Sequence, residues 1–418
     1  MNILVVGGGG REHAIITALS KSPKVEKIWA APGNGGISAL AECFPVKATD
    51  LDGILGLAKK LNPDFVFVAP DDPLVMGMVD RLNEAGFRTF GPRANAAILE
   101  GSKVFSKALM KKYGIPTAGY ETFTDADKAI EYIKAQNSYP AVIKCDGLAL
   151  GKGVIVAQTV EEAKAAVRSM IEDKAFGQSG ARVVIEEFME GPEVSVLSFT
   201  DGETVVPMVS SMDHKCALDG DKGPNTGGMG TVAPNPYYTP AIAAECMEKI
   251  FLPTIRAMNA EGCPFKGCLY FGLMLTPDGP KVIEYNCRFG DPETQVVLPL
   301  LESDLLKIMT ACTEGTLADT EVKFSEGAAC CVILASGGYP VSYKKGKPIS
   351  GLTNGQLEGE SNITVYHSGT ALREDGTLVT NGGRVLGVTA AAPRLTAAIT
   401  QAYAAAEKIR SRRPSGLR

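Results

Sequence analysis

The chain has 418 residues, of which 45% are hydrophobic and 21% are charged, and its formal net charge is −5. This length exceeds one ordinary core, so we expect several domains. The composition is typical of a soluble globular protein and lacks the basic excess of a nucleic-acid binder. No apolar run approaches the roughly 18 residues that cross a bilayer. Met1 leads into an apolar strand without a signal peptide, so we expect a cytoplasmic protein without membrane contact.

Ten cysteines are scattered along the chain, mostly within apolar strand-like runs. Their spacing lacks the paired CxxC elements that a zinc site requires. We therefore interpret them as reduced core cysteines rather than as metal ligands or disulfides.

The first hundred residues alternate between strand-like and helix-like segments, from NILVV through REHAIITALS and KIWAA to DFVFVAP. Such alternation predicts βαβ units on a parallel sheet. We assign residues 1–103 to this N-terminal Rossmann-like α/β domain. A lysine-bearing helical segment follows and ends at Gly114 and Pro116. These breakers indicate a linker region over residues 104–120.

The glycine loop after the first strand precedes a helix, as in dinucleotide-binding sites. The spacing G-x-G-x-x-G fails, because a motif started at Gly7 meets Glu12 and one started at Gly8 meets His13. No acidic residue follows the second strand where a ribose ligand is needed. The loop with Arg11 still suits a phosphate, so a phosphorylated small molecule is favoured over NAD. A capping role is the alternative for Glu12 and His13.

Residues 121–190 predict a compact α/β unit of the size of a lid. Its strand PAVIKC ends near Lys144, and Gly151 and Gly153 loosen the following loop. Backbone amides and Lys152 can then fold over a polyphosphate. The loop is not a P-loop, because no Ser or Thr follows Lys152. An ordinary glycine hairpin with solvated lysines remains the alternative.

The strand RVVIEEF ends in Glu186 and Glu187. Backbone groups at this strand end can pair with an adenine edge, while Glu193 can reach a ribose. A solvated strand end is the alternative, and only the combination with the lysine loop and Glu284 favours a nucleotide.

A central domain is expected over residues 191–325. It contains the polar loop GPNTGGMG at 223–230, which either binds an anion or turns a corner. Just before it, Asp213 suits an ammonium partner. His214 is interpreted as a hydrogen-bonding loop residue rather than a ligand or base.

A hairpin in the same domain pairs LYFGLML with KVIEYN across the turn TPDGP and continues into CRFGDPE. Alternate side chains of a strand share a face, so one face should carry Val282, Glu284, Asn286 and Arg288, and the other Ile283, Tyr285, Cys287 and Phe289. Two oxygens from the first face can hold a hard cation, and Mg²⁺ accepts such sparse protein ligation. Arg288 offers a fork for a phosphoryl oxygen. A polar, solvated strand face is the alternative.

Residues 326–418 are rich in strand-like segments and glycine, and they end in a helical segment. This pattern predicts a small β-rich domain closed by one helix. His367 lies on one of its strands, far in sequence from the other polar clusters, and is interpreted as structural.

Several of these segments occur together in one known family. In chain order they are GGGGREHA, EGSKVFSK, VIKCDGLALGKGVIVA, DHK with GPNTGGMG, EYNCRFGDPETQ, ASGGYP and TNGGRVL. In this order they resemble the glycinamide ribonucleotide synthetases, ATP-grasp ligases of purine synthesis, over nearly the whole chain. The resemblance implies that 5-phosphoribosylamine, glycine and ATP condense through glycyl phosphate, with Mg²⁺ or Mn²⁺ as the metal. It implies small-molecule partners and allows contacts with other purine-pathway enzymes.

The resemblance also implies a layout and roles for single residues. Residues 1–103 would bind substrate, 121–190 would form the ATP-grasp lid, and 191–325 the central ATP-grasp domain. The metal ligands would be Glu284 and Asn286, and the catalytic residues would be Asp213, Arg288 and Asp291. ATP would be bound by Lys103, Lys144, Gly151, Lys152, Gly153, Glu186, Glu187, Phe188 and Glu193. The other substrates would be bound by Gly10, Arg11, Glu12, Asp71, Asn225 and Thr226.

Some positions depart from the family pattern. Cys145 and Leu150 stand where alanine is common, and Cys216 stands where arginine is common, which removes a charge beside the glycine loop. Asp71 occupies the place of a glutamate, so its substrate contact would use a shorter arm. The chain ends in SRRPSGLR where the family continues into an aromatic segment, which reads as an altered or truncated end.

Three alternatives remain at this point. An ATP-grasp ligase of other substrates would keep the same ATP residues. A dinucleotide-dependent oxidoreductase would use the N-terminal domain, against the glycine spacing found there. A catalytically silent binding protein would keep the fold, and the altered tail is the one feature that favours it.

Overall fold

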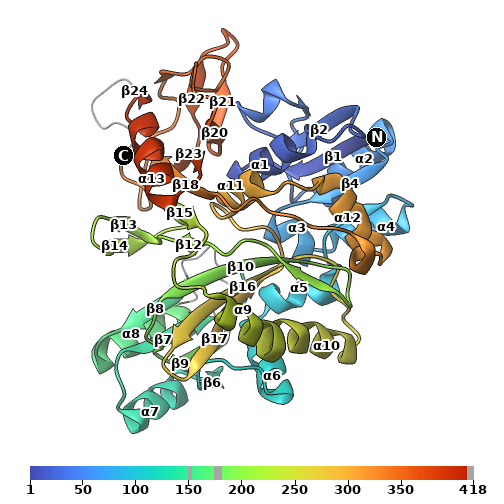
Figure 1. Cartoon of the computed structure of the whole chain (residues 1–418). Coiled ribbons are helices and arrows are strands. Elements are labelled where there is room, and N and C mark those ends of the chain that lie inside the picture. Colours follow the sequence, from blue (N-terminus) through green and yellow to red (C-terminus); the bar gives the residue numbers. More distant parts are fainter. Residues whose placement is uncertain (149–152, 174–180, 412–418) are drawn as a thin grey trace.

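The computed structural model describes residues 1–148, 153–173 and 181–411. Four sheets of four or five strands form its framework. Figure 1 shows the N-terminal domain beside the C-terminal domain, with the lid and the central sheet below them. This arrangement confirms the expected multidomain α/β fold with a Rossmann-like N-terminal part.

The N-terminal sheet is parallel, in the order β3-β2-β1-β4-β5. Successive residues of its central strand β1 (Asn2–Gly7) face opposite cores: Leu4 and Val6 lie in one buried cluster, and Ile3 and Val5 in another. Helices therefore cover both faces, as a parallel sheet requires. The other elements are α1 (Gly10–Leu19), β2 (Lys27–Pro32), η1 (Ile37–Ala39), β3 (Glu42–Cys43), α2 (Leu51–Leu61), β4 (Phe65–Val68), α3 (Asp71–Val75), α4 (Met78–Glu84), β5 (Thr89–Phe90) and α5 (Ala94–Gly101).

The lid is an antiparallel sheet with two helices packed on one face. Its strand order is β6-β9-β7-β8. A small core of its own joins the sheet to α7 and α8. Its elements are β6 (Tyr120–Phe123), α7 (Ala126–Gln136), β7 (Ala141–Cys145), β8 (Val154–Ala157), α8 (Val160–Ile171) and β9 (Val183–Glu187).

The central sheet is antiparallel, in the order β11-β10-β16-β17. The expected hairpin is present: β16 pairs with β17 and turns between Thr276 and Gly279. The elements of this part are α6 (Lys103–Tyr113), β10 (Glu193–Thr200), β11 (Val205–Pro207), α9 (Pro240–Cys246), the π-helical η3 (Met247–Phe251), α10 (Leu252–Ala260), β16 (Gly267–Thr276) and β17 (Gly279–Asn286).

One prediction about β17 is wrong. Strict alternation placed Val282 on the same face as Glu284, but Val282 is buried in the core cluster that also contains Tyr285. The pairing shifts between Gly272 and Leu273, so that Gly272 faces Glu284 and Leu273 faces Val282. The extra residue, Ile283, forms a bulge and reverses the alternation.

The C-terminal sheet draws strands from two distant parts of the chain. Its order is β12-β15-β18-β23-β20, with α13 (Leu395–Ala406) packed on β18 and β23. Two of the strands come from residues 212–233, which the sequence assigns to the central domain, so the division at residue 325 stays a prediction. The strands are β12 (Met212–Asp213), β15 (Gly230–Ala233), β18 (Ala328–Ala335), β20 (Ile363–His367) and β23 (Arg384–Ala392).

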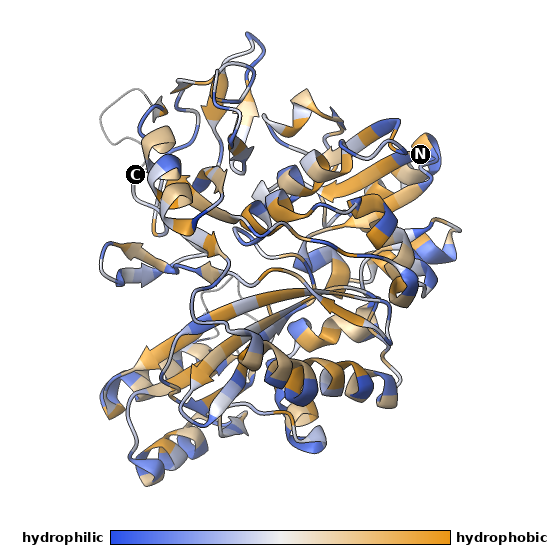
Figure 2. Ribbon diagram, in the orientation of Figure 1, coloured by the Kyte–Doolittle hydropathy of each residue, from blue (hydrophilic) through white to orange (hydrophobic). Residues whose placement is uncertain are grey.

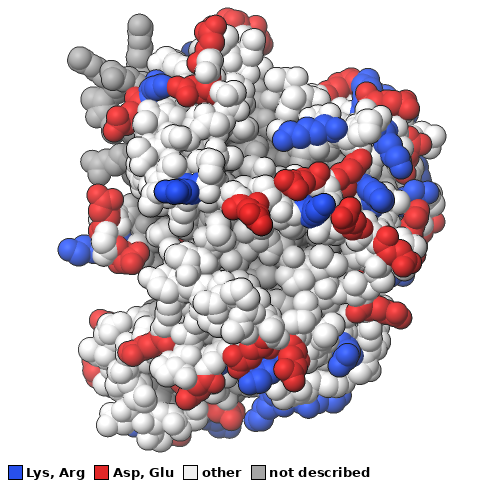
Figure 3. Space-filling view, viewed as in Figure 1, with Lys and Arg blue, Asp and Glu red and all other residues white. Residues whose placement is uncertain are grey.

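Smaller elements complete the described chain. They are β13 (Cys216–Leu218), β14 (Lys222–Asn225), α11 (Thr294–Val297), η4 (Leu298–Leu300), α12 (Leu305–Glu314), η5 (Leu317–Asp319), β19 (Ile349–Ser350), β21 (Thr370–Leu372), β22 (Leu378–Thr380) and β24 (Arg410–Ser411). Hydrophobic residues concentrate in the sheets and on the inner faces of the helices (Figure 2). Acidic and basic side chains are interspersed over the N-terminal domain on the face in Figure 3. Among the described residues, every helix is too short or too polar to span a lipid bilayer.

Candidate active site

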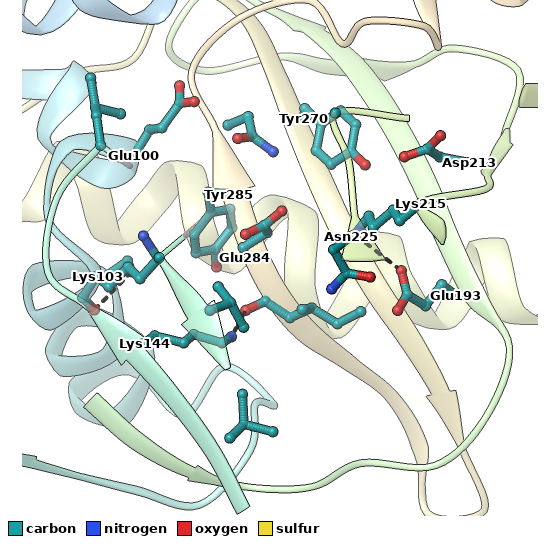
Figure 4. A pocket seen from close by; sticks show the side chains of 18 of the residues that line it. Glu100, Lys103, Lys144, Glu193, Asp213, Lys215, Asn225, Tyr270, Glu284 and Tyr285 are labelled. Carbon is teal, nitrogen blue, oxygen red and sulfur yellow. Dashed lines mark hydrogen bonds and ion pairs between the residues drawn. The ribbon is translucent and has the colours of Figure 1, made fainter. Parts of the chain in front are cut away.

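A cavity of about 520 Å³ lies where the N-terminal domain, the lid, the central sheet and the C-terminal domain meet. Each of these parts supplies charged side chains, for example Arg11 from α1, Lys144 from β7, Glu284 from β17 and Arg384 from β23. Figure 4 shows Lys103 and Lys144 on one side of Glu284, and Lys215 with Glu193 on the other. Segments far apart in the sequence thus build one charged pocket.

A buried ion network lies under the lid side of the pocket. Glu186 bridges two lysines, with Lys144 Nζ 2.9 Å from Oε2 and Lys107 Nζ 3.2 Å from Oε1. Lys144 also donates to the carbonyl oxygen of Ile283 at 3.2 Å, and Lys107 to the hydroxyl of Thr117 at 2.8 Å. Burial, together with the charge of Lys144, outweighs the attraction of Glu186 and lowers the pKa of Lys107 to about 8.

The start of α6 is fastened to the loop that follows β7. Asp146 accepts hydrogen bonds from Ser102 Oγ at 2.9 Å and from the Val104 amide at 3.1 Å. Lys103 Nζ donates to the Gly147 carbonyl at 3.0 Å (Figure 4). These bonds hold Lys103 at the pocket wall. Gly153 lines the pocket, whereas the predicted ATP residues Gly151 and Lys152 lie outside the described residues, as does Leu150.

Glu284 and Asn286 both line the pocket from β17. Burial alone would raise the pKa of Glu284, but the charges of Lys215 and Lys144 lower it below its ordinary value. The carboxylate is therefore ionised, and with the Asn286 amide oxygen it offers the hard oxygen donors that Mg²⁺ prefers. Within the described residues, no three His, Cys, Asp or Glu side chains cluster as metal ligands. A cation here would therefore need further oxygens from substrate or water.

Arg288 lies between Asn286 of β17 and Glu100 of the N-terminal domain. Its Nη2 is 3.0 Å from Glu100 Oε1 and 3.2 Å from Asn286 Oδ1, and 3.8 Å from Asp71 Oδ2. Burial disfavours its charge, but Glu100 and Asp71 together raise the pKa of the guanidinium. Its Nε is buried without a hydrogen-bond partner among the described residues. Arg288 itself lines the pocket.

The glycine loop at the start of α1 holds Arg11 against the pocket. Glu12 accepts from Arg11 Nε at 2.8 Å and from the Gly9 amide at 2.6 Å. Glu12 and Gly10 therefore lie behind Arg11 and do not line the pocket themselves. A Cβ on Gly10 would lie 2.5 Å from Gln295 Nε2, so a larger residue would displace the loop.

Asp291 faces Arg11 across this corner. Its Oδ2 accepts from the Arg11 amide at 3.4 Å, and its Oδ1 accepts from Gln295 Nε2 at 2.8 Å. Burial raises the pKa of Asp291, but the charges of Arg384 and Arg11 lower it below its ordinary value. This carboxylate stays ionised.

A second acidic group, Asp213, lies on the neighbouring strand β12, beside the loop 226–228 and Pro292. Burial and the charge of Glu293 raise the pKa of Asp213 well above its ordinary value, and its Oδ1 has no hydrogen-bond partner among the described residues. Tyr270 donates its hydroxyl to Glu293 Oε1 at 3.1 Å. Lys215 Nζ is 3.2 Å from Glu193 Oε2 (Figure 4). Burial likewise raises the pKa of Glu293.

The loop after β14 completes this corner. Thr226 donates its hydroxyl to the Lys215 carbonyl at 2.9 Å and accepts from the Gly228 amide at 3.0 Å. Asn225 Oδ1 lies 3.7 Å from Cys216 Sγ. At the far end of the pocket, Glu187 Oε1 accepts from the Gly119 amide at 3.0 Å.

Most of the predicted site residues come together in this pocket. Those that line it are Arg11, Asp71, Lys103, Lys144, Gly153, Glu186, Glu187, Phe188, Glu193, Asp213, Asn225, Thr226, Glu284, Asn286, Arg288 and Asp291. Charged and aromatic lining residues that sequence reasoning gave no role include Glu100, Lys107, Lys215, Tyr270, Glu293, Tyr339 and Arg384. Several of them lie in the segments quoted above, such as EGSKVFSK and TNGGRVL, yet no local pattern separates them from ordinary surface charges.

The class of this protein follows from its similarity to a known enzyme domain. The model of the ATP-grasp (A) domain of phosphoribosylglycinamide synthetase matches residues 101–294. Together with the lid, the central sheet and the charged pocket between them, this match makes the chain an ATP-grasp carboxylate–amine ligase. The comparisons support no oxidoreductase alternative.

The other models identify the family. The N domain of phosphoribosylglycinamide synthetase matches residues 1–100, and its C domain matches residues 329–414. The chain belongs to the phosphoribosylglycinamide synthetase family.

Curated relatives agree over nearly the whole length. The phosphoribosylamine–glycine ligase of Halalkalibacterium halodurans is 50% identical over 98% of this chain and 94% of its own length. That of Vibrio vulnificus is 48% identical over 98% of this chain and 95% of its own.

Solved structures agree as well. The phosphoribosylamine–glycine ligase of Thermotoga maritima superposes with a TM-score of 0.87 at 34% identity, covering 100% of this chain and 98% of that one. The biotin carboxylase domain of Hydrogenobacter thermophilus 2-oxoglutarate carboxylase gives a TM-score of 0.75 at 18% identity, covering 100% and 91%. At that identity the likeness concerns the fold alone.

Proposed function

We propose that the chain joins 5-phosphoribosylamine to glycine and forms glycinamide ribonucleotide, ADP and phosphate through glycyl phosphate. The relatives named as phosphoribosylamine–glycine ligases, which match at up to 50% identity, support this reaction. The observation that carries the proposal is one pocket that combines the lysines of the lid side with Glu284, Asn286 and Arg288 of the central domain.

The nucleotide end of the pocket lies under the lid. Lys103, Lys144, Gly151, Lys152 and Gly153 would contact the phosphates of ATP. The β9 end, from Glu186 to Phe188, would face the adenine, and Glu193 the ribose. Closure of the lid would exclude water, which otherwise hydrolyses an acyl phosphate.

Glu284 and Asn286 would hold Mg²⁺ or Mn²⁺ through their side-chain oxygens. A bound divalent ion would neutralise charge that develops on the transferred phosphoryl group. Arg288 would bind an oxygen of the acyl phosphate through its guanidinium, since a planar guanidinium fits phosphate oxygens. These side chains supply the electrostatic stabilisation on which phosphoryl transfer mainly depends.

The other end of the pocket would receive the two remaining substrates. Asp213 and Asp291 would face the ammonium of glycine and the attacking amine, with Asn225 and Thr226 beside them. The sugar phosphate would lie near Arg11, which Glu12 and Gly10 hold in place, and near Asp71. The amine of phosphoribosylamine is itself the nucleophile, so no side chain needs to form a covalent intermediate.

The domain roles follow the same division and are part of the proposal. Residues 1–103 would bind the phosphoribosyl substrate, 121–190 would close as the lid, and 191–325 would grip ATP beside the linker 104–120. Residues 326–418 would cover the substrate end. Contacts with other purine-pathway enzymes stay a prediction.

The test is release of ADP by the purified protein with ATP and Mg²⁺, with glycine and freshly generated phosphoribosylamine added separately and together. Mass spectrometry of the product identifies what was joined. We expect ADP and glycinamide ribonucleotide only when all substrates are present. ADP release with another acid or amine, and none with glycine and phosphoribosylamine, would refute the assignment of substrates.

A further inference from the structure

The C-terminal domain reaches into the pocket through Arg384, at the start of β23. Its Nη1 donates to three backbone carbonyl oxygens, those of Gly227 at 2.6 Å, Gly228 at 3.4 Å and Asp291 at 2.7 Å. Its Nη2 lies 3.6 Å from Asp291 Oδ1. One side chain therefore ties β23 to two separate loops of the pocket wall.

Tyr339 binds the backbone of the same residue, Gly227, through its amide. The amide of Gly227 donates to the Tyr339 hydroxyl at 3.2 Å, so both polar backbone groups of this residue are bound by side chains of the C-terminal domain. A Cβ on Gly227 would lie 3.1 Å from Arg384 Cζ. The guanidinium therefore rests directly against the loop, with no room between them for a larger side chain.

The loop that is held in this way touches the substrate end of the pocket. Gly228 has a positive φ of +110°, and a Cβ there would lie 2.6 Å from Asp213 Oδ1 and 2.5 Å from Pro292 Cδ. A small shift of the loop would thus displace Asp213. Thr226, two residues before Gly228, is bonded to the Lys215 carbonyl at 2.9 Å, so the shift would reach the lysine as well.

The nucleotide end is fastened by other contacts. Lys144 is bonded to Glu186 and to the Ile283 carbonyl, and Lys103 to the Gly147 carbonyl. All of these partners belong to the lid or the central sheet. The hydrogen bonds of Arg384 therefore hold loops at the substrate end of the pocket and leave the contacts of the nucleotide end untouched.

We infer that Arg384 is a positioning residue that fixes the loop 226–228 and Asp291 in the arrangement that receives glycine and the attacking amine. A planar guanidinium presents its donors in fixed directions and can bind two loops at once, whereas a lysine ammonium carries its three donors on a single atom. The identity of the substrates rests on the proposed function. The arrangement of the loop does not, and it can be measured without turnover.

The experiment compares four full-length variants: Arg384→Met, Arg384→Lys, Tyr339→Phe and Arg373→Met. The last is the matched control, because Arg373 lies in the same domain and also donates to a backbone carbonyl, that of Gly346 at 2.7 Å, but away from the pocket. Each variant is assayed for kcat and for KM of glycine, for the Kd of ATP with Mg²⁺ by calorimetry, and for hydrogen exchange of peptides covering 222–230.

For Arg384→Met we expect kcat/KM for glycine to fall about tenfold or more, the factor for losing a hydrogen bond from a charged donor. The Kd of ATP should stay within about twofold. Amides of 226–228 should exchange about tenfold faster while lid peptides are unchanged. Arg384→Lys should recover part of the loss, and Tyr339→Phe should show a smaller change in the same direction. The control Arg373→Met should match the wild type.

Two results would overturn the inference. One is loss of ATP affinity by the same factor as kcat/KM for glycine, which would indicate general damage rather than positioning. The other is unchanged exchange of the 222–230 peptides in Arg384→Met. A third result separates the two proposals. If these peptides exchange faster in Arg384→Met but the wild type makes no glycinamide ribonucleotide, the positioning role is supported and the assignment of the substrates is refuted.

Discussion

Replacement of Arg288 separates its role in stability from its role in catalysis. Its Nη2 binds Glu100 at 3.0 Å and Asn286 at 3.2 Å, while its Nε is free and buried. In Arg288→Lys the ammonium can keep the pair with Glu100 but cannot also present a second donor in a fixed direction to a phosphoryl oxygen. We expect the free energy of unfolding to fall by about 1 kcal/mol. One lost hydrogen bond from a charged donor, about 1.5–3 kcal/mol, should lower kcat by roughly 10- to 150-fold.

The variant Arg288→Met measures how much Arg288 contributes to stability. It leaves Glu100 buried with the Cys287 amide at 2.7 Å as a remaining donor, so we expect a loss near the lower end of the 3–5 kcal/mol typical of a broken buried pair. The double variant Arg288→Met/Glu100→Met should recover part of that stability and none of the activity. Urea unfolding and ADP release measure the two quantities.

An exposed arginine serves as the control for this experiment. Arg88 lies 3.2 Å from Glu314, and both side chains are nearly half exposed, so Arg88→Lys should change stability by less than about 0.5 kcal/mol and leave turnover intact. A wild-type kcat in Arg288→Lys would refute the phosphate-binding role. A double variant no more stable than Arg288→Met would refute the argument from the buried charge.

Three further predictions concern charged groups in and around the pocket. Glu284→Gln should lower ADP release at saturating Mg²⁺ by at least about a hundredfold. Urea unfolding should show a modest loss of stability, because burial is outweighed by the charges of Lys215 and Lys144, which lower the pKa of this carboxyl and so favour its ionised form in the folded chain. Turnover near the wild-type rate would exclude the metal assignment. Burial lowers the pKa of Lys107 from 10.5 to about 8. The unfolded chain keeps this proton to higher pH than the folded chain. The free energy of unfolding of the wild type, measured relative to that of Lys107→Met, should therefore rise between pH 8 and 10.5. A difference between the two proteins that does not change with pH in urea unfolding would contradict this. Burial and the charge of His367 lower the pKa of His13 from 6.5 to about 3. The wild type should therefore lose stability as the pH falls below 6.5. His13→Asn should lose less, and its side chain can still accept the hydrogen bond from the His367 amide seen at 2.8 Å. Equal losses in acid unfolding curves would argue against a buried neutral His13.

The parts of the fold that follow from local pattern were predictable. Alternating strands and helices in the first hundred residues give the parallel sheet, and the turn formers between Thr276 and Gly279 give the β16–β17 hairpin. The bulge at Ile283 was not predictable in the same way. It depends on how β17 meets its partner strand at Gly272, which the sequence of β17 does not contain.

The site shows the same division. Glu284, Asn286 and Arg288 follow one another on a strand end, so their spacing places them together. Lys107 lies one helical turn after Lys103 on α6, and Arg384 enters the pocket from the start of β23 in the C-terminal domain. Their local sequences resemble those of solvated charges, and only tertiary packing assigns them partners.

The crossing of β12 and β15 into the C-terminal sheet sets a limit on how this protein can be divided. A fragment that began at residue 326 would carry β18 with one side unpaired where β15 belongs. An exposed strand edge of this kind invites pairing with another chain, and therefore aggregation. On the ribosome, residues 212–233 leave the exit tunnel before the strand that pairs with them has been made. The segment that shapes the substrate end of the pocket must therefore wait for the C-terminal strands before it can settle.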